Sequence, residues 1–155
     1  MSRIKEKKLK ICLACSAGGH LTQLLQLNDL WKNYEHFYLT FKSKSSLNLT
    51  GKTYYIINPK RNPILFLLVF IQSLAIFLIE KPQIVITTGA GVAIPISLIS
   101  KIFGKKVIFI ESFSRVKTPS PTGKLLYLFA DLFLVQWKSL LNKYGPKARY
   151  EGAVF

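Results

Sequence analysis

The longest apolar segment of the chain covers residues 64–79, which read ILFLLVFIQSLAIFLI and are interrupted only by Gln72 and Ser73. As an α-helix this segment would measure about 24 Å. That is short of the roughly 30 Å hydrocarbon core of a bilayer, so a membrane span is disfavoured. A span would also separate the predicted strands on either side of it. We therefore expect a crossover helix with one face on a sheet and the other on lipid or a partner.

Short apolar runs alternate with helical patterns along the rest of the chain. Predicted strands cover residues 9–15, 36–41, 53–57, 83–88, 106–110, 132–135 and 152–155, and predicted helices cover 20–32, 92–103, 122–130 and 138–144. Apolar strands that alternate with helices are typical of a parallel sheet covered on both faces. The sequence thus predicts one α/β, Rossmann-like domain over residues 1–155, with a basic tail at residues 1–8.

The composition combines 50% hydrophobic residues with a formal net charge of +15. Charge attracts anions, and excess apolar surface favours a partner or a bilayer. The combination predicts a protein that lies against anionic lipid, handles a phosphate-bearing substrate or docks to another subunit. Nucleic acid is the competing explanation of the charge. The lysines are scattered and no RNA-binding signature is present, so we expect no nucleic-acid partner.

The cysteines and histidines predict no metal or cofactor. Cys12 and Cys15 form a CxxC pair, but they lie within a predicted strand and not at the opening of a helix, as a thioredoxin-like motif requires. A zinc site would need two further ligands, and His20 and His36 lack the spacing for it. The two cysteines are therefore interpreted as core or loop residues.

Three loops that follow predicted strands are rich in glycine or polar residues: 16–20, 87–91 and 111–114. The carboxyl ends of parallel strands meet at one edge of a sheet, where ligands bind. Glycine allows close backbone approach, and helix N-terminal amides can hold an anion, so two glycine loops at one crevice predict a diphosphate site. The pattern matches neither GxGxxG nor a P-loop, and Phe41-Lys42 stands where a dinucleotide enzyme carries an acid. Simple punctuation of the fold remains the alternative.

Two side chains at these loops could take part in chemistry. His20, at the start of a predicted helix, could be the general base for an acceptor hydroxyl, or could only stabilise the turn. Glu111 directly follows a predicted strand and could orient His20, bind sugar hydroxyls, or pair with a lysine or Arg115. The loop after it also carries Arg115, Lys117 and Lys124, which offer cations to a pyrophosphate or to lipid headgroups, or form an ordinary solvated loop.

Four segments, in order along the chain, carry a family resemblance: CSAGGHLTQLL (15–25), PQIVITTGAGVAIP (82–95), VIFIESFSRVKTPSPTGKLLYLFADLFLVQW (107–137) and EGAVF (151–155). With these segments the chain resembles the N-terminal, acceptor-binding domain of the GT-B glycosyltransferases that form lipid II. It resembles still more the stand-alone form of that domain. That form is the membrane-anchor subunit of the eukaryotic enzyme that adds the second N-acetylglucosamine to dolichol diphosphate, with bacterial capsular and exopolysaccharide relatives.

The resemblance implies roles for particular residues. The family's acceptor-diphosphate loops fall on Ser16, Gly18, Gly19, Thr88, Gly89 and Gly91, with His20 and Glu111 as catalytic candidates. The family's membrane-associated patch falls on segment 64–79, with Leu65, Phe66, Leu68, Val69 and Phe70 expected to face the membrane. No transmembrane helix precedes the domain, so peripheral or monotopic attachment at the cytoplasmic face of the membrane is expected.

The resemblance also implies a division of labour. The chain ends where related single-chain enzymes continue into a nucleotide-sugar domain, so a separate subunit would bind the UDP-sugar. The expected protein is one half of an inverting glycosyltransferase, inactive alone, that binds a polyprenyl-diphosphate-linked sugar. A non-catalytic membrane scaffold that only recruits and stabilises the catalytic partner is the alternative.

Overall fold

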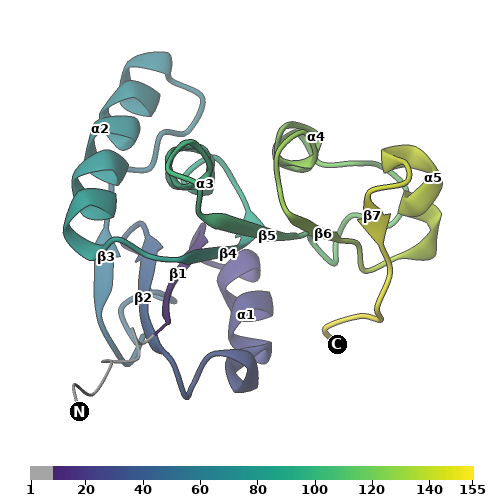
Figure 1. The fold of residues 1–155 in the computed structure, drawn as a ribbon, viewed down its shortest axis with the longest axis horizontal. Helices are drawn as coiled ribbons and strands as arrows, with labels where there is room; N and C mark the ends of the chain where they lie inside the picture. Colours follow the sequence, from purple (N-terminus) through teal and green to yellow (C-terminus); the bar gives the residue numbers. More distant parts are fainter. Residues whose placement is uncertain (1–8) are drawn as a thin grey trace, which may run out of the picture.

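The structure is a computed structural model that describes residues 9–155, so the predicted basic tail lies outside the described residues. Within that range, seven parallel strands form one sheet in the order β3-β2-β1-β4-β5-β6-β7 (Figure 1). The strands are β1 Lys10–Cys15, β2 Glu35–Thr40, β3 Thr53–Tyr55, β4 Ile84–Gly89, β5 Lys106–Ile110, β6 Leu132–Leu134 and β7 Ala148–Arg149. The predicted parallel α/β sheet is confirmed.

Helices cover both faces of this sheet, as predicted. They are α1 Gly19–Gln26, α2 Pro63–Glu80, α3 Ala93–Ile102, α4 Pro121–Tyr127 and α5 Leu141–Tyr144, with 3₁₀ turns at Asn28–Leu30 and Lys138–Leu140. Helix α1 lies on one face, and α2, α3 and α4 lie on the other (Figure 1). Because side chains alternate along a strand, Leu13 packs toward α1 while Cys12 and Ala14 pack toward α2 and α3.

Both cysteines belong to this core, as interpreted. Cys12 and Cys15 are buried free thiols on opposite faces of β1. Burial raises the pKa of both thiols, and that of Cys15 reaches about 12. Neither thiol is therefore a ready nucleophile at neutral pH, because the reactive species is the thiolate.

Helix α2 is the crossover helix expected from the apolar segment. It begins at Pro63, where the Asn62 side chain accepts hydrogen bonds from the amides of Ile64 (2.9 Å) and Leu65 (3.2 Å). Its 18 residues have a mean hydropathy of 2.3, so by length and composition it could cross a membrane, and 28% of it is buried. The strands on either side of it, β3 and β4, lie in the same sheet. In this fold α2 therefore runs along the sheet and keeps its outer face free.

A buried carboxylate holds the end of α2 against the sheet. Glu80 is 5% exposed and accepts hydrogen bonds from the Lys10 ammonium (3.1 Å) and the Tyr54 hydroxyl (2.5 Å), and it also pairs with Lys52. Burial alone would raise the pKa of Glu80, but these hydrogen bonds outweigh it and lower the pKa to about 2. The last turn of α2 is thus tied to both β1 and β3.

Two predicted elements differ from the structure. The helix expected over residues 20–32 ends at Gln26, because a 3₁₀ turn follows and places the Trp31 side chain in the core. The strand expected over residues 152–155 is absent from the described chain, and the last strand is Ala148–Arg149. Gly145 has φ 109°, and the turn there brings Arg149 into register with β6, so its carbonyl accepts from the Val135 amide (2.8 Å).

Candidate functional site

The strand order reverses between β1 and β4, which lie side by side near the middle of the sheet. The chain leaves β1 toward α1 on one face and leaves β4 toward α3 on the other (Figure 1). The carboxyl ends of these two strands are therefore the switch point at which open α/β sheets bind ligands, and we call this place the crevice. The two predicted glycine loops lie here, and Cys15 is paired in register with Gly89. The structure therefore brings the loops at 16–20 and 87–91 together.

Glycine is required at two positions of this crevice. Gly18 (φ 96°), just before α1, and Gly89 (φ 107°), at the end of β4, have left-handed backbones that other residues rarely adopt. Gly19 does not share this constraint. A Cβ atom on Gly19 would meet no heavy atom within 4 Å, so the space in front of the first turn of α1 is open.

His20 and Thr88 join the two glycine loops by a reciprocal pair of hydrogen bonds. The His20 ring nitrogen Nδ1 lies 2.7 Å from the Thr88 carbonyl oxygen, and the Thr88 hydroxyl donates to the His20 carbonyl oxygen at 2.8 Å. A Cβ on Gly89 would lie 3.6 Å from the His20 ring, in ordinary contact. The imidazole is therefore held directly against the second loop.

The contact with Thr88 determines the tautomer of His20. A carbonyl oxygen can only accept, so Nδ1 carries the proton and, in the neutral ring, Nε2 has a free lone pair. Burial is the largest effect and lowers the pKa of His20. The hydrogen bond to Thr88 and the charge of Glu111 raise the pKa in part, and the charge of Arg115 lowers it further. The ring is thus predominantly neutral at pH 7 and available as a proton acceptor.

Glu111 has a different environment from His20. It is 1% exposed, and its carboxylate accepts from the amides of Ser112 (2.8 Å) and Ser120 (3.0 Å) and from the Tyr144 hydroxyl. Among residues 9–155 it forms no ion pair, so one of the three alternatives for Glu111, pairing with a lysine or Arg115, is not present. Its carboxylate closes the loop 112–120, and this geometry favours a positioning role over direct contact with a sugar.

The structure adds residues that the sequence did not single out. The Ser45 hydroxyl accepts a hydrogen bond from the Gly18 amide at 3.0 Å, so the serine-rich loop after β2 forms part of the crevice. A Cβ on Gly91 would lie 3.6 Å from Pro59, which places the loop that carries Lys60 and Arg61 beside the second glycine loop. The only sequence signal for these contacts was that the loops carrying Ser45 and Pro59 follow predicted strands, so they begin at the same edge of the sheet as the glycine loops.

The expected membrane-facing residues of α2 are only partly exposed. Leu68 is 40% exposed, and Leu65, Phe66 and Phe70 are half-buried. The prediction that Val69 faces the membrane is wrong, because its side chain is 0% exposed and packs into the core beneath the helix. The outer face consists instead of residues that lie a few positions away along the helix: Ile64, Leu67, Ile71, Leu78 and Ile79, which are 51–70% exposed.

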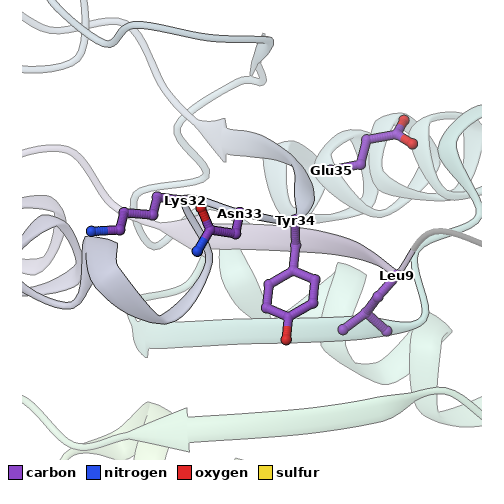
Figure 2. A pocket seen from close by; sticks show the side chains of 5 residues that line it. All are labelled: Leu9, Lys32, Asn33, Tyr34 and Glu35. Atoms are coloured by element: carbon purple, nitrogen blue, oxygen red, sulfur yellow. The ribbon is translucent and has the colours of Figure 1, made fainter.

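The surface is hollowed both at the amino ends and at the carboxyl ends of the strands. One hollow of about 450 Å³ is bordered by Leu9, Tyr34 and Glu35 (Figure 2). It lies at the amino ends of β1 and β2, so it is remote from the glycine loops at the carboxyl ends. Another, of about 340 Å³, lies at the carboxyl ends of β5 and β6 and is lined by Leu27, Leu30 and the segment 151–154. Leu30 is 60% exposed there, and among the described helices only α1 covers this face of the sheet.

The described residues hold no cluster of three His, Cys, Asp or Glu side chains that could bind a metal ion. What the crevice offers is open space beside backbone amides, a neutral imidazole and nearby cationic side chains. Such an arrangement can hold an anionic group and accept a proton from a hydroxyl beside it.

The fold defines a class of protein. The chain superposes on MurG of Acinetobacter baumannii with a TM-score of 0.76 at 16% identity, covering 93% of this chain and 45% of MurG. The UDP-GlcNAc 2-epimerase of Methanocaldococcus jannaschii gives a TM-score of 0.70 at 15% identity, over 94% of this chain and 46% of the epimerase. The chain spans just under half of these proteins, and its fold is that of the N-terminal half of a GT-B glycosyltransferase.

The sequence then places the chain in a family. Residues 59–154 match the family described as "Oligosaccharide biosynthesis protein Alg14 like", and the chain belongs to it. It is 29% identical to the human UDP-N-acetylglucosamine transferase subunit ALG14 over 96% of this chain and 84% of the human protein. The Schizosaccharomyces pombe subunit is 42% identical over 47% of this chain and 37% of that protein. The family resemblance drawn from the sequence is confirmed.

Proposed function

We propose that this chain is the acceptor-binding subunit of a membrane-associated, inverting glycosyltransferase that makes a lipid-linked oligosaccharide or polysaccharide. The observation that carries this proposal is the crevice in which two glycine loops meet across the His20–Thr88 pair. Its occupant would be the diphosphate of a polyprenyl-diphosphate-linked sugar. Membership of a family whose relatives are named as UDP-N-acetylglucosamine transferase subunits supports the reaction class.

In the proposed reaction, the glycine loops and the first turn of α1 hold the diphosphate by backbone amides, and the charge of Arg115 supports them. The acceptor sugar hydroxyl attacks the anomeric carbon of the donor sugar from the face opposite UDP. The new glycosidic bond forms as the bond to UDP breaks, and the hydroxyl proton passes to Nε2 of His20. The configuration at the anomeric carbon is inverted, and UDP leaves with the electron pair. Glu111 positions the loop that carries Arg115.

The donor would come from a second subunit. Relatives of this chain are named as subunits of a UDP-N-acetylglucosamine transferase, which supports a separate nucleotide-sugar-binding partner here. The apolar hollow beside Leu30, at the carboxyl ends of β5 and β6, fits the edge of such a partner. A partner bound there would face the crevice from the side of the sheet opposite α2 (Figure 1).

Reconstitution tests this proposal. The chain would be combined with a nucleotide-sugar-binding protein from the same cell, UDP-N-acetylglucosamine and N-acetylglucosaminyl-diphosphate-polyprenol, and transfer would be followed by chromatography of the lipid product. We expect Gly19→Ala to lower the transfer rate about 10–100-fold, because the new methyl group occupies the space in front of the amides. Folding stability should stay the same or rise by up to about 1 kcal/mol, since alanine favours the helix.

Two controls accompany this variant. Gly104→Ala lies at the end of α3 with φ 69° and should lose stability with normal transfer per folded molecule. Leu30→Asp should abolish co-purification of the partner and leave the fold intact. Transfer at full rate by the partner without this chain would refute the proposal, and an unchanged rate for Gly19→Ala would support the scaffold alternative.

We further propose that the outer face of α2 attaches the protein to the cytoplasmic face of the membrane. Ile64, Leu67 and Ile71 are exposed on it, and Lys60 and Arg61 precede the helix, where they can meet headgroup phosphates. We expect Leu67→Asp combined with Ile71→Asp to lower sedimentation with phosphatidylglycerol-containing vesicles at least about 10-fold. The matched pair Leu30→Asp and Leu128→Asp, exposed elsewhere, should leave it unchanged. Equal loss in both pairs would contradict attachment through α2.

A further inference from the structure

A third hollow lies beyond the carboxyl ends of β2 and β3, next to α2. It has a volume of about 420 Å³. Its apolar walls come from Phe41, Tyr55, Ile56 and Ile57, and the polar residues Lys42, Asn58 and Gln72 complete the lining. Ile56 is buried in the core beneath, whereas Tyr55 and Ile57 remain 36% and 37% exposed. The hollow is thus an accessible apolar surface with a cation beside it, at the same edge of the sheet as the glycine loops.

One short loop joins this hollow to the glycine crevice. Lys42 begins the loop 42–47, whose Ser45 hydroxyl accepts from the Gly18 amide at 3.0 Å. The Tyr55 hydroxyl donates to the Ser46 carbonyl oxygen of the same loop at 2.9 Å. The loop therefore borders the crevice with one side and the hollow with the other. A ligand whose anionic end lies on the glycine loops could continue past Lys42 into the hollow.

On its other side the hollow meets the outer face of α2. The Ile57 amide donates to the Gln72 side-chain oxygen at 3.0 Å, which holds the segment after β3 on the middle of the helix. Leu68 lies one turn before Gln72 on the same helix face and is 40% exposed. The apolar surface of the hollow thus continues toward the face of α2 that we assign to the membrane.

We propose that this hollow binds the first isoprene units of the acceptor's polyprenyl chain, between the diphosphate site and the membrane. This assignment rests on the proposed function and adds the part of the acceptor that the chain recognises beyond the diphosphate. Branched apolar isoprene units match the walls formed by Phe41, Tyr55 and Ile57, and the Lys42 ammonium complements the adjacent phosphate charge. The chain would then select a prenyl diphosphate over a nucleoside or inorganic diphosphate.

Calorimetric titration of the full chain with farnesyl diphosphate and with inorganic pyrophosphate tests the assignment. We expect farnesyl diphosphate to bind at least about 10-fold more tightly than pyrophosphate. Ile57→Glu should remove this difference while the affinity for pyrophosphate stays the same. Leu128→Glu, at a side chain 75% exposed on a distant part of the surface, should change neither affinity. If Ile57→Glu does not fold, Ile57→Ser replaces it, because the backbone amide that contacts Gln72 is kept.

The outcomes separate this inference from the proposed function. Equal affinities for both ligands in the unmodified chain would overturn the isoprene site and leave the diphosphate site in place. An undiminished preference for farnesyl diphosphate in Ile57→Glu, or an equal loss in Leu128→Glu, would place the prenyl chain elsewhere and overturn it as well. If neither farnesyl diphosphate nor pyrophosphate binds, the diphosphate site is refuted and the isoprene site with it.

Discussion

Replacement of His20 by alanine is expected to lower the rate of sugar transfer by about 10²–10⁴-fold in the reconstituted system, the range typical of a lost general base. The physical reason is the hydrogen bond from Nδ1 to the Thr88 carbonyl oxygen, which leaves Nε2 as the only lone pair of the ring. The partner should still co-purify with the variant. The measurement is the single-turnover rate of lipid-product formation at saturating UDP-sugar.

The pH dependence of the reaction provides a second readout of the same residue. Because burial lowers the pKa of His20 below 6.5, the ring stays unprotonated at pH 7. The rate should be level above about pH 6.5 and fall as the pH drops through the lowered pKa. Folding stability should fall in the same direction, since below pH 6.5 the unfolded chain binds more protons than the folded one at this position.

His36 offers a matched control for both experiments. Its Nδ1 also lies close to a backbone carbonyl, that of Tyr34 at 2.9 Å, but His36 is in β2, two residues beyond Tyr34 and near the amino edge of the sheet. His36→Ala should leave the transfer rate and its acid limb unchanged. A normal transfer rate in His20→Ala would show that His20 only stabilises the glycine turn and would favour the scaffold alternative.

Glu111→Ala is expected to destabilise the fold by about 3–5 kcal/mol. Removal of the carboxylate leaves the amides of Ser112 and Ser120 and the Tyr144 hydroxyl without an acceptor in a buried site. The site has little room for rearrangement, because a Cβ on Gly123 would already lie 2.6 Å from the carboxylate. Urea unfolding followed by circular dichroism measures the change.

Two further variants calibrate this result. Tyr144→Phe removes one of the three donors and should cost about 1–2 kcal/mol, which also keeps the test valid if Glu111→Ala does not fold. Glu151→Ala removes an exposed carboxylate and should change stability by less than about 0.5 kcal/mol. Normal stability with lost transfer in Glu111→Ala would contradict the positioning role and indicate contact with the substrate.

Strands and helices predicted from the spacing of apolar residues agree with the structure where the pattern is confined to one short segment. The strand predicted at 106–110 has those bounds, and the helix of the long apolar segment differs by one residue at each end. The two predicted elements that differ from the structure do so for identifiable reasons. Trp31 continues the helical spacing of leucines, but its core position is reached through a 3₁₀ turn. The strand expected at 152–155 is not formed, because residues 148–149 already occupy the edge of β6.

Much of the candidate site was visible in the sequence as loops, but not as contacts. The two glycine loops were predicted from their places after strands, and the family resemblance assigned Gly18, Gly19, Thr88, Gly89 and Gly91 to the diphosphate. The structure brings the two loops together. Ser45 was not proposed, because its contact with Gly18 spans 27 residues and has no pattern of its own. Val69 was placed on the membrane side, because a helix that is apolar on all sides gives no periodic signal of which face is buried.

The sequence by itself determined the alternation of strands and helices, the glycine turns at strand ends and the family, because each depends on neighbouring residues or on ordered motifs. The tertiary structure decided the strand order, the neutral tautomer of His20, the buried environment of Glu111 and the outer face of α2. These depend on contacts between distant residues: His20 meets Thr88 across 68 positions, and Glu111 meets Tyr144 across 33. Local pattern carries no record of such pairs, since they form only when the strands assemble into one sheet.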